Sequence, residues 1–229
     1  NVLEGPFGYF PLYEGAHAAK SVAQTLGQTW RILEMAHKPF PSGRATHGLI
    51  DATRQLRARH GFTATDVAKV EGRLPSLTHR LIGRPPRPDM TPNYARLCGR
   101  YAVASTLVSG DVGIPDFQEA ALRDPTRLAL ADRVELTVDD NPDPNALTPI
   151  AVSVTLTSGE RFEIVLETVY GGPADPMTEA ARLEKFRRNC AAGRPGLPED
   201  RAEALIAAVE GVEALDDARR LIDLAVAPA

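Results

Sequence analysis

The sequence predicts an α+β protein in which a small mixed α/β region is followed by helices alone. Alternating apolar residues mix with helical patterns in the middle of the chain, whereas only helical patterns follow residue 172. The chain has 229 residues, of which 43% are hydrophobic and 24% charged. This composition is typical of globular proteins, and the length suffices for one large domain or two smaller ones.

The first third of the chain contains a loop region, two predicted helices and two predicted strands. Residues 1–29 are rich in glycine, proline and aromatic residues, which predicts a loop packed on a larger body and then a short helix. Residues 30–37 and 67–75 are predicted strands. Between them, Gly61 is placed to end a helix in the left-handed conformation. The apolar positions of that helix are Ala45, Leu49, Ala52 and Leu56.

The remaining elements follow from capping and turn signals. Residues 91–110 predict one helix, with Thr91 as its cap, Pro92 in its first position and Gly110 after its end. A second helix, over 114–133, is interrupted near Asp124-Pro125. The later elements are a strand at 133–140, a hairpin at 150–167 that turns at Ser158-Gly159, a linker at 171–176, and two polar helices around 177–190 and 198–226.

Charge is unevenly distributed along the chain. The net charge of -4 indicates no general affinity for nucleic acid. Residues 31–101 nevertheless carry 13 Lys and Arg against 5 Asp and Glu, while residues 102–229 carry 12 against 23. Either the basic third faces an anionic ligand, or these charges only line solvated helix faces.

Several classes of protein are disfavoured by the sequence. No apolar run approaches the roughly 20 residues that span a bilayer, and no secretory signal is visible. Cys98 and Cys190 are too few for a disulfide framework or a zinc site, so a reducing, cytoplasmic setting is expected. Cys98 lies on an apolar helix stripe and is expected to be a buried core residue. Because the chain begins with Asn1, we expect it not to start at the beginning of the gene product.

Residues 36–48, AHKPFPSGRATHG, contain the strongest local signal for a binding site. The two prolines hold Lys38 extended at a predicted strand end, and Ser42 is a candidate N-cap for the following helix. The positive end of that helix, together with Arg44 and His47, would then form a carboxylate or phosphate pocket. The alternatives are solvated cations and a structural histidine.

A second group of candidates lies on the predicted helix 91–110. Tyr101 falls on its apolar stripe, which favours a core tyrosine whose hydroxyl needs a partner. Arg96 and Arg100 are one turn apart, so they either mark a polar face or line the same pocket as Lys38. The chain shows no nucleotide-binding, metalloprotease or serine-hydrolase motif, and neither a metal nor an organic cofactor is expected.

Four segments resemble the MmgE/PrpD family in their order and spacing, and the resemblance covers essentially the whole chain. They are LEGPFGYFPLYEG, HKPFPSGRATHGLIDA, NYARLCGRYAVASTLVSGDVGIPDF and LEKFRRNC. The family fold consists of a large helical domain and a smaller α/β lid, with the active site between them. The resemblance therefore implies the end of the first helical part at 1–25, the lid at 26–172, and returning helices of the helical domain at 173–229.

The resemblance also implies a function. Lys38 matches the lid lysine of the family motif K-x-[FY]-P, which contacts substrate carboxylates, and Tyr101 matches a lid tyrosine that points into the site. We therefore expect Lys38 and Tyr101 to be catalytic, with Ser42, Arg44, His47 and Arg100 binding substrate. Family members often carry cysteine where Ser42 and Gly43 stand here. The expected activity is that of a cofactor-independent hydro-lyase resembling 2-methylcitrate dehydratase, acting in propionate metabolism on a small di- or tricarboxylate.

Three further expectations accompany this assignment. The family's aspartate and histidine acid–base residues belong mostly to the first helical domain, which this chain lacks, so the chain alone is expected to be inactive. The family commonly forms homodimers. The alternatives are an epimerase, isomerase or decarboxylase of the same family, or a non-catalytic accessory α/β subunit.

Overall fold

A computed structural model describes residues 2–14 and 24–226, and the chain divides into two compact units, Asn1–Ala36 and His37–Ala229. The first unit contains a π-helical turn, η1 (Phe10–Glu14), and a 3-10 turn, η2 (Arg31–Glu34). Part of the short helix expected within residues 1–29 lies outside the described residues. The domain boundaries implied by the resemblance stay predictions.

The strand predicted over residues 30–37 is wrong, because a 3-10 turn occupies its centre. An ion pair of 2.9 Å between Arg31 and Glu34, three residues apart, matches the helical turn. Ile32 and Leu33 are more than 70% exposed, so they do not pack as a strand against a sheet. A short apolar segment of this kind forms a stable strand only where a neighbouring strand and a core are available.

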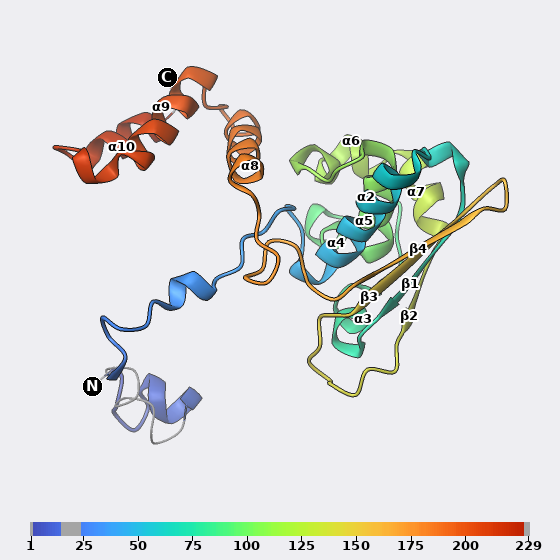
Figure 1. Ribbon diagram of the computed structural model, residues 1–229, viewed down its shortest axis with the longest axis horizontal. Helices are drawn as coiled ribbons and strands as arrows, with labels where there is room; N and C mark the ends of the chain where they lie inside the picture. Colours follow the sequence, from blue (N-terminus) through green and yellow to red (C-terminus); the bar gives the residue numbers. More distant parts are fainter. Residues whose placement is uncertain (1, 15–23, 227–229) are drawn as a thin grey trace. The chain divides into compact units, whose positions relative to one another are not determined.

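The second unit is built on a four-stranded mixed sheet with the order β2-β1-β3-β4 (Figure 1). Strands β1 and β2 are parallel, whereas β3 runs antiparallel to both β1 and β4. Val152 on β3 lies opposite both Gly72 on β1 and Ile164 on β4, so it occupies the middle of the sheet. The strands are β1 (Val67–Leu74), β2 (Val134–Val138), β3 (Ile150–Leu156) and β4 (Arg161–Leu166).

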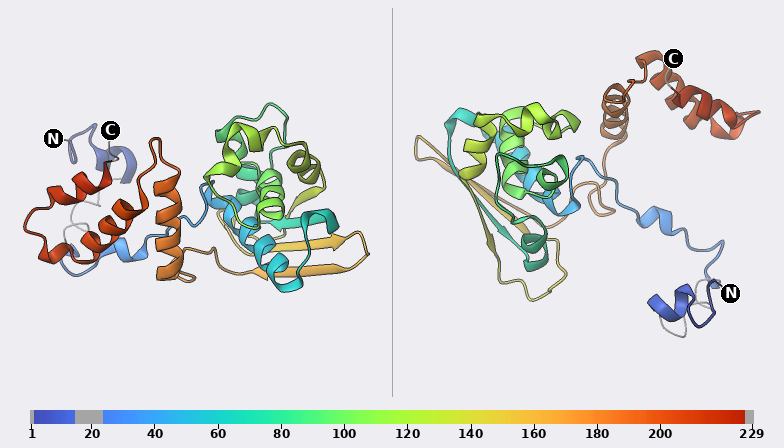
Figure 2. Two further views of the ribbon diagram at one scale, coloured as in Figure 1. Left: turned by 90° about the horizontal axis from the view of Figure 1, so that it is seen from above. Right: turned by 180° about the vertical axis from the view of Figure 1, so that it is seen from behind.

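Helices cover one face of this sheet, as the views in Figures 1 and 2 show. The main core lies between the two layers and includes Leu49, Val103 and Val152, each fully buried. The opposite face carries polar side chains such as Glu71, Arg73 and Glu135. The helices are α2 (His47–His60), α3 (Ser76–Ile82), α4 (Pro92–Ala95), α5 (Gly99–Ser109), α6 (Glu119–Leu122) and α7 (Pro125–Asp132), with 3-10 turns η3 (Arg44–Thr46), η4 (Ala64–Asp66) and η5 (Ile114–Phe117).

The α+β class is confirmed, and most of the predicted elements in the second unit are present. The strands at 67–75 and 133–140, the hairpin at 150–167 and the helix ending before Gly61 all form. Gly61 and Gly110 end their helices with φ of 71° and 82°. The interruption at Asp124-Pro125 is also confirmed, since Asp124 caps α7 by accepting from the amide of Thr126.

The predicted helix 91–110 is instead two helices, α4 and α5. Thr91 and Pro92 begin α4 as expected, but Cys98 is extended and forms an isolated bridge with Gly83. A Cβ atom at Gly99 would lie about 3 Å from side chains of Leu49 and Leu136. Close packing on the sheet therefore redirects the chain, and a local pattern of helical residues does not reveal this.

From residue 177 to 226 the structure contains three α-helices rather than the expected two. They are α8 (Glu179–Ala191), α9 (Glu199–Glu210) and α10 (Arg219–Ala225), with a 3-10 turn, η6 (Val212–Ala214), after α9. Gly211 closes α9, and the carboxylate of Asp217 accepts from the amide of Arg219 at the start of α10. Among the described residues, no helix combines the length and apolar character that crossing a membrane requires.

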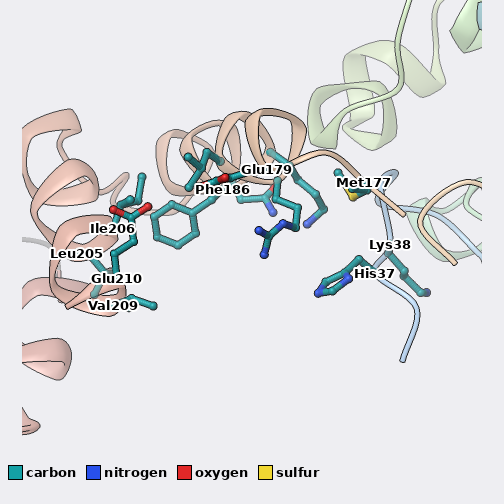
Figure 3. A pocket seen from close by; sticks show the side chains of 13 residues that line it. His37, Lys38, Met177, Glu179, Phe186, Leu205, Ile206, Val209 and Glu210 are labelled. Carbon is teal, nitrogen blue, oxygen red and sulfur yellow. The ribbon is translucent and has the colours of Figure 1, made fainter. Parts of the chain in front are cut away.

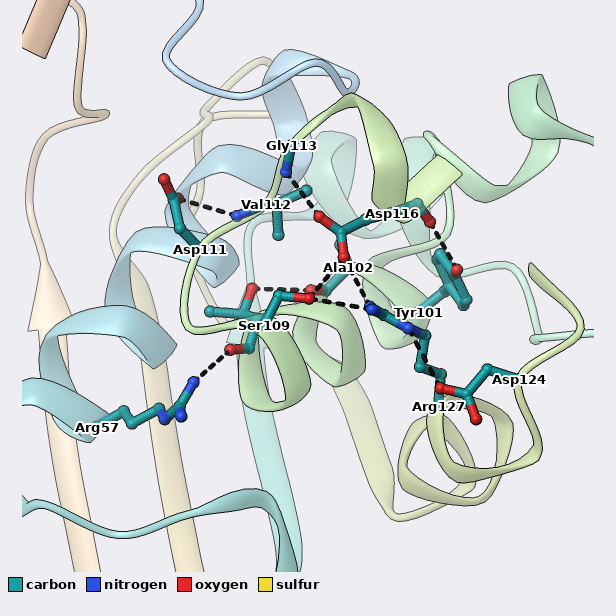
Figure 4. A network of polar contacts seen from close by, with 11 residues as sticks. Arg57, Tyr101, Ala102, Ser109, Asp111, Val112, Gly113, Asp116, Asp124 and Arg127 are labelled. Carbon is teal, nitrogen blue, oxygen red and sulfur yellow. Dashed lines mark hydrogen bonds and ion pairs between the residues drawn. The ribbon is translucent and has the colours of Figure 1, made fainter. Parts of the chain in front are cut away.

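A buried polar network joins α5, η5 and α7 (Figure 4). One carboxylate oxygen of Asp116 accepts from the hydroxyl of Ser109 at 2.6 Å and pairs with Arg127 at 2.8 Å. The other accepts from the amide of Gly113 at 2.7 Å, while the hydroxyl of Tyr101 donates to the Asp116 carbonyl at 2.7 Å. Both members of the ion pair are at least 88% buried, and removing the Asp116 charge leaves Arg127 with the longer, 3.4 Å contact to Asp124.

We therefore expect Asp116→Asn to lower the free energy of unfolding by about 3 kcal/mol, as for other buried ion pairs that lose one member. Urea unfolding measures this change. Asp111→Asn is the matched control, because Asp111 pairs with Arg188 near the surface; a loss within about 1 kcal/mol is expected there. Equal losses in the two variants would contradict the structural role of the network.

His47 lies in the core at the start of α2 and is fully buried. Its ring packs edge-to-face on Phe40, and neither ring nitrogen has a hydrogen-bond partner among the described residues. The pKa of His47 is lowered from 6.5 to about 4, mainly by burial and in smaller part by the charges of Lys38 and Arg44. The nearby carbonyls of Ser42 and Phe40 oppose this shift without making well-formed hydrogen bonds. His47 is therefore neutral at pH 7.

This burial predicts a stability that falls in mild acid. The unfolded chain protonates His47 below pH 6.5, whereas the folded chain does so only near pH 4. The contribution of His47 is therefore complete above pH 6.5 and falls between pH 6.5 and 4, by on the order of 3 kcal/mol. Urea unfolding of the native chain and His47→Leu at several pH values isolates this slope. An NMR titration in which the His47 ring protonates near pH 6.5 would contradict it.

Candidate active site

The segment 37–43 carries Lys38 and is anchored at its first residue by the loop that follows β4. The amide of His37 donates to the carbonyl of Gly171 at 2.8 Å. Gly171 has φ of 85°, and a Cβ atom there would lie 2.3 Å from the carbonyl oxygen of His37. Glycine therefore permits both the turn and the close approach of the two chain segments.

The other end of the segment is fixed against the end of α4. The amide of Gly43 donates to the carbonyl of Arg96 at 2.9 Å, and a Cβ atom at Gly43 would lie 2.4 Å from Leu97. The hydroxyl of Ser42 contacts that of Thr46 at 2.8 Å, and Thr46 in turn donates to the Gly43 carbonyl. Lys38 is therefore presented by a segment that is held at both ends.

Lys38 is exposed, and its ammonium contacts the backbone of its own segment. Its Nζ donates to the carbonyl of Ser42 at 3.2 Å, and no carboxylate of the described residues lies within ion-pair distance of it. The residue lines three surface depressions. A cation with spare donors in such a position can bind an anion.

The first depression, which we call the α8–α9 groove, has a volume of about 560 Å³ and is largely apolar. Figure 3 shows Phe186 of α8 facing Leu205, Ile206 and Val209 of α9, with His37 and Lys38 at the opposite end. The side chain of Lys38 extends away from the apolar residues of α9 in this view. The groove is therefore better suited to an apolar partner than to a small anion.

The second depression lies against α8 and measures about 210 Å³. Lys185 and Arg188 line it together with the segment from Lys38 to Pro41. Arg188 is already paired with Asp111 at 3.0 Å, a contact that also attaches α8 to the loop after α5. One of its cations is therefore engaged within the protein.

The third depression, the Lys38–Arg96 hollow, is lined by the anchored segment and by residues at and after α4, and it measures about 690 Å³. Two cations, Lys38 and Arg96, line it, whereas no acidic residue does. The remaining lining residues are Pro41, Ser42, Gly43, Asn93, Leu97 and Ile114. This composition gives the hollow a positive potential that favours a small anion.

The predicted contribution of the α2 N-terminus to this site is wrong. Ser42 does not cap the helix, because a 3-10 turn precedes α2 and Thr46 stands at the cap position, with no side-chain hydrogen bond that caps the helix. The first four residues of α2, from His47 to Ile50, are all buried. The amides of Ser42, Gly43 and Thr46 already donate to carbonyls of the chain. The positive end of the helix therefore faces the core rather than a ligand.

Of the six predicted site residues, the structure brings Lys38 and Ser42 to the Lys38–Arg96 hollow. None of the three depressions is lined by His47, Arg44, Arg100 or Tyr101. A guanidinium nitrogen of Arg44 lies near Gly172, in the loop after β4. These placements leave the predicted substrate contacts of the four residues without geometric support in this chain.

Tyr101 and Cys98 belong to the second apolar cluster of the core. Tyr101 is fully buried, its hydroxyl bonds to the carbonyl of Asp116, and burial raises its pKa. Burial also raises the pKa of the Cys98 thiol, as expected for a core cysteine. Within the described ranges, no cluster of three or more His, Cys, Asp or Glu is arranged to hold a metal.

Arg96 lines the hollow, whereas the sequence predicts Arg100, one turn further on, as the arginine of this segment that binds substrate. Assigning residues 91–110 to one helix gave no basis for choosing Arg96 over Arg100. The break between α4 and α5 separates them, and only Arg96 reaches the hollow. A glycine directly before the second arginine, at Gly99, was the available sequence signal for this break.

Comparison with known proteins agrees with the resemblance in sequence. Cis-aconitate decarboxylase of Homo sapiens is 29% identical over 235 residues, covering 99% of this chain and 47% of the relative. The Mus musculus protein of the same name is 29% identical over 202 residues, covering 85% of this chain and 40% of the relative. The chain thus spans less than half the length of these curated relatives.

A family model provides the broader assignment. The MmgE/PrpD C-terminal domain matches residues 40–214, which include the Lys38–Arg96 hollow apart from Lys38 itself. This match extends over more than half of the chain and over every strand of the sheet. The chain belongs to the MmgE/PrpD family.

Proposed function

We propose that this chain supplies the carboxylate-binding part of a cofactor-independent lyase that acts on a small di- or tricarboxylate. The observation that carries this proposal is the unpaired ammonium of Lys38 beside a hollow lined by a second cation and no acid. Membership of the MmgE/PrpD family and the similarity to cis-aconitate decarboxylases support a lyase reaction.

The chemistry requires stabilisation of negative charge on a carboxylate. Removing a proton from the neighbouring carbon leaves an electron pair that spreads into that carboxylate and makes it enolate-like. An ammonium held at this position stabilises the transition state more than the ground state, because the charge grows there. Lys38 performs this role in the proposal, and the base and acid that move protons come from a helical partner region.

Two finer reactions fit this arrangement. Loss of water follows from the resemblance to 2-methylcitrate dehydratase, with an acid protonating the departing hydroxyl. Loss of carbon dioxide is favoured by the name of the relatives, with the electron pair of the broken carbon–carbon bond taken up by a proton. NMR of the products in deuterated water distinguishes these reactions from epimerisation, in which only deuterium exchange at carbon accompanies inversion.

In a preparation that contains the helical partner region, we expect Lys38→Gln to lower kcat/KM for the active polycarboxylate tenfold to about a hundredfold. This range corresponds to losing one hydrogen bond to a charged group. Lys69→Gln is the matched control, since Lys69 pairs with Glu71 and Glu135 on the open face of the sheet. Near-normal kinetics for Lys38→Gln would defeat the assignment.

The apolar surfaces of the chain support a helical partner. The α8–α9 groove is lined by Leu183, Phe186, Leu205, Ile206 and Val209, and Val209 is 54% exposed. The curated relatives extend well beyond the length matched here. We propose that a helical region of this additional length, on the same or a separate polypeptide, packs into the groove, and that the complete protein is a cytoplasmic homodimer.

The groove provides a test of this partner. We expect Val209→Glu to weaken association with the helical region at least tenfold, because it places a charge in a desolvated apolar interface. Val165→Glu is the control, because Val165 is a similarly exposed valine on β4. Analytical ultracentrifugation of labelled chains measures association with the helical region, and it also shows whether the complete protein is a dimer. Unchanged association for Val209→Glu would show that the partner binds elsewhere.

A further inference from the structure

We infer that Arg96 binds a second carboxylate of the same ligand, opposite Lys38, and so makes the hollow selective for anions with at least two carboxylates. This inference deepens the proposed function and rests on it for the identity of the ligand class. It does not depend on which bond the enzyme breaks. Arg96 is assigned a binding and positioning role rather than a role in proton transfer.

The backbone holds Arg96 and Lys38 in a fixed relation. Arg96 directly follows the last residue of α4, and its carbonyl accepts from Gly43 at 2.9 Å. Ser42, the residue before Gly43, accepts from the Lys38 ammonium at 3.2 Å. The two cations are therefore linked through two consecutive residues of one anchored segment.

The guanidinium of Arg96 has unused binding capacity. Its Nε is buried without a hydrogen-bond partner, and its one side-chain bond among the described residues is a 3.3 Å contact to Asn93. The group rests 5.7 Å from the ring centre of Phe117, which supports its plane from one side. By contrast, Arg127 pairs with Asp116 and Asp124. An unpaired guanidinium edge matches the two oxygens of a carboxylate.

The chemistry of the lining identifies the ligand class. Lys38 provides a compact positive charge and Arg96 a planar fork, while no acidic side chain of the hollow neutralises either. A volume of about 690 Å³ is ample for an acid of six carbon atoms. A monocarboxylate brings one negative charge to two cations, so a second carboxylate should add affinity.

The test measures binding of propane-1,2,3-tricarboxylate to the 229-residue chain by NMR, with butyrate as the monocarboxylate comparison. Arg96→Gln should weaken tricarboxylate binding at least tenfold and bring it close to that of butyrate. Arg96→Lys should restore part of the lost affinity. Arg87→Gln is the matched control, because Arg87 is exposed, stacks on Tyr94 and does not line the hollow. The affinity of this variant for the tricarboxylate should stay within twofold of that of the native chain.

The folding of each variant is checked through the Gly43 amide signal, since its bond uses the Arg96 backbone rather than the side chain. Equal affinity in Arg96→Gln and the native chain would overturn the inference, as would absence of tricarboxylate binding by the native chain. Arg96-dependent binding without lyase turnover in the complete protein would support the inference while defeating the proposed function.

Discussion

The contact between Gly43 and the end of α4 is the constraint on which the rest of the site depends. The Gly43 amide donates to the Arg96 carbonyl, and only a residue without a Cβ fits against Leu97 at that distance. This contact fixes the segment that carries Lys38 and also holds the backbone of Arg96, the second cation that lines the hollow. The positions of both cations in the site thus depend on this one backbone contact.

Burial of the α2 N-terminus explains why the site relies on side-chain cations. The helix begins in the core, where a Cβ atom at Gly48 would lie 2.7 Å from Ile150 of β3. The helix dipole is therefore directed at packed residues, and His47 remains neutral there because its pKa is lowered to about 4. Positive charge reaches the surface only through long side chains, which Lys38 and Arg96 provide.

Local patterns predicted the elements whose stability is local. The hairpin at 150–167 and the cap at Thr91 follow from alternation and capping, and both are present. The break before Gly99 and the turn at Arg31–Glu34 depend on contacts far along the chain or on the lack of a neighbouring strand. For the same reason, the local motif predicts Lys38 as a site residue. That Arg96 lines the hollow follows only from the three-dimensional fold.

A hollow whose two charged lining residues are both cations is suited to hold and polarise a polycarboxylate but has no carboxylate or imidazole base in its lining. Two other ionisable residues of the predicted site are committed elsewhere: His47 is enclosed in the core, and the hydroxyl of Tyr101 is bonded within the Asp116 network. A lyase mechanism at this hollow therefore requires an acid and a base presented from outside it. The apolar α8–α9 groove, which shares Lys38 with the hollow, offers a surface by which such a partner can be positioned next to the ligand.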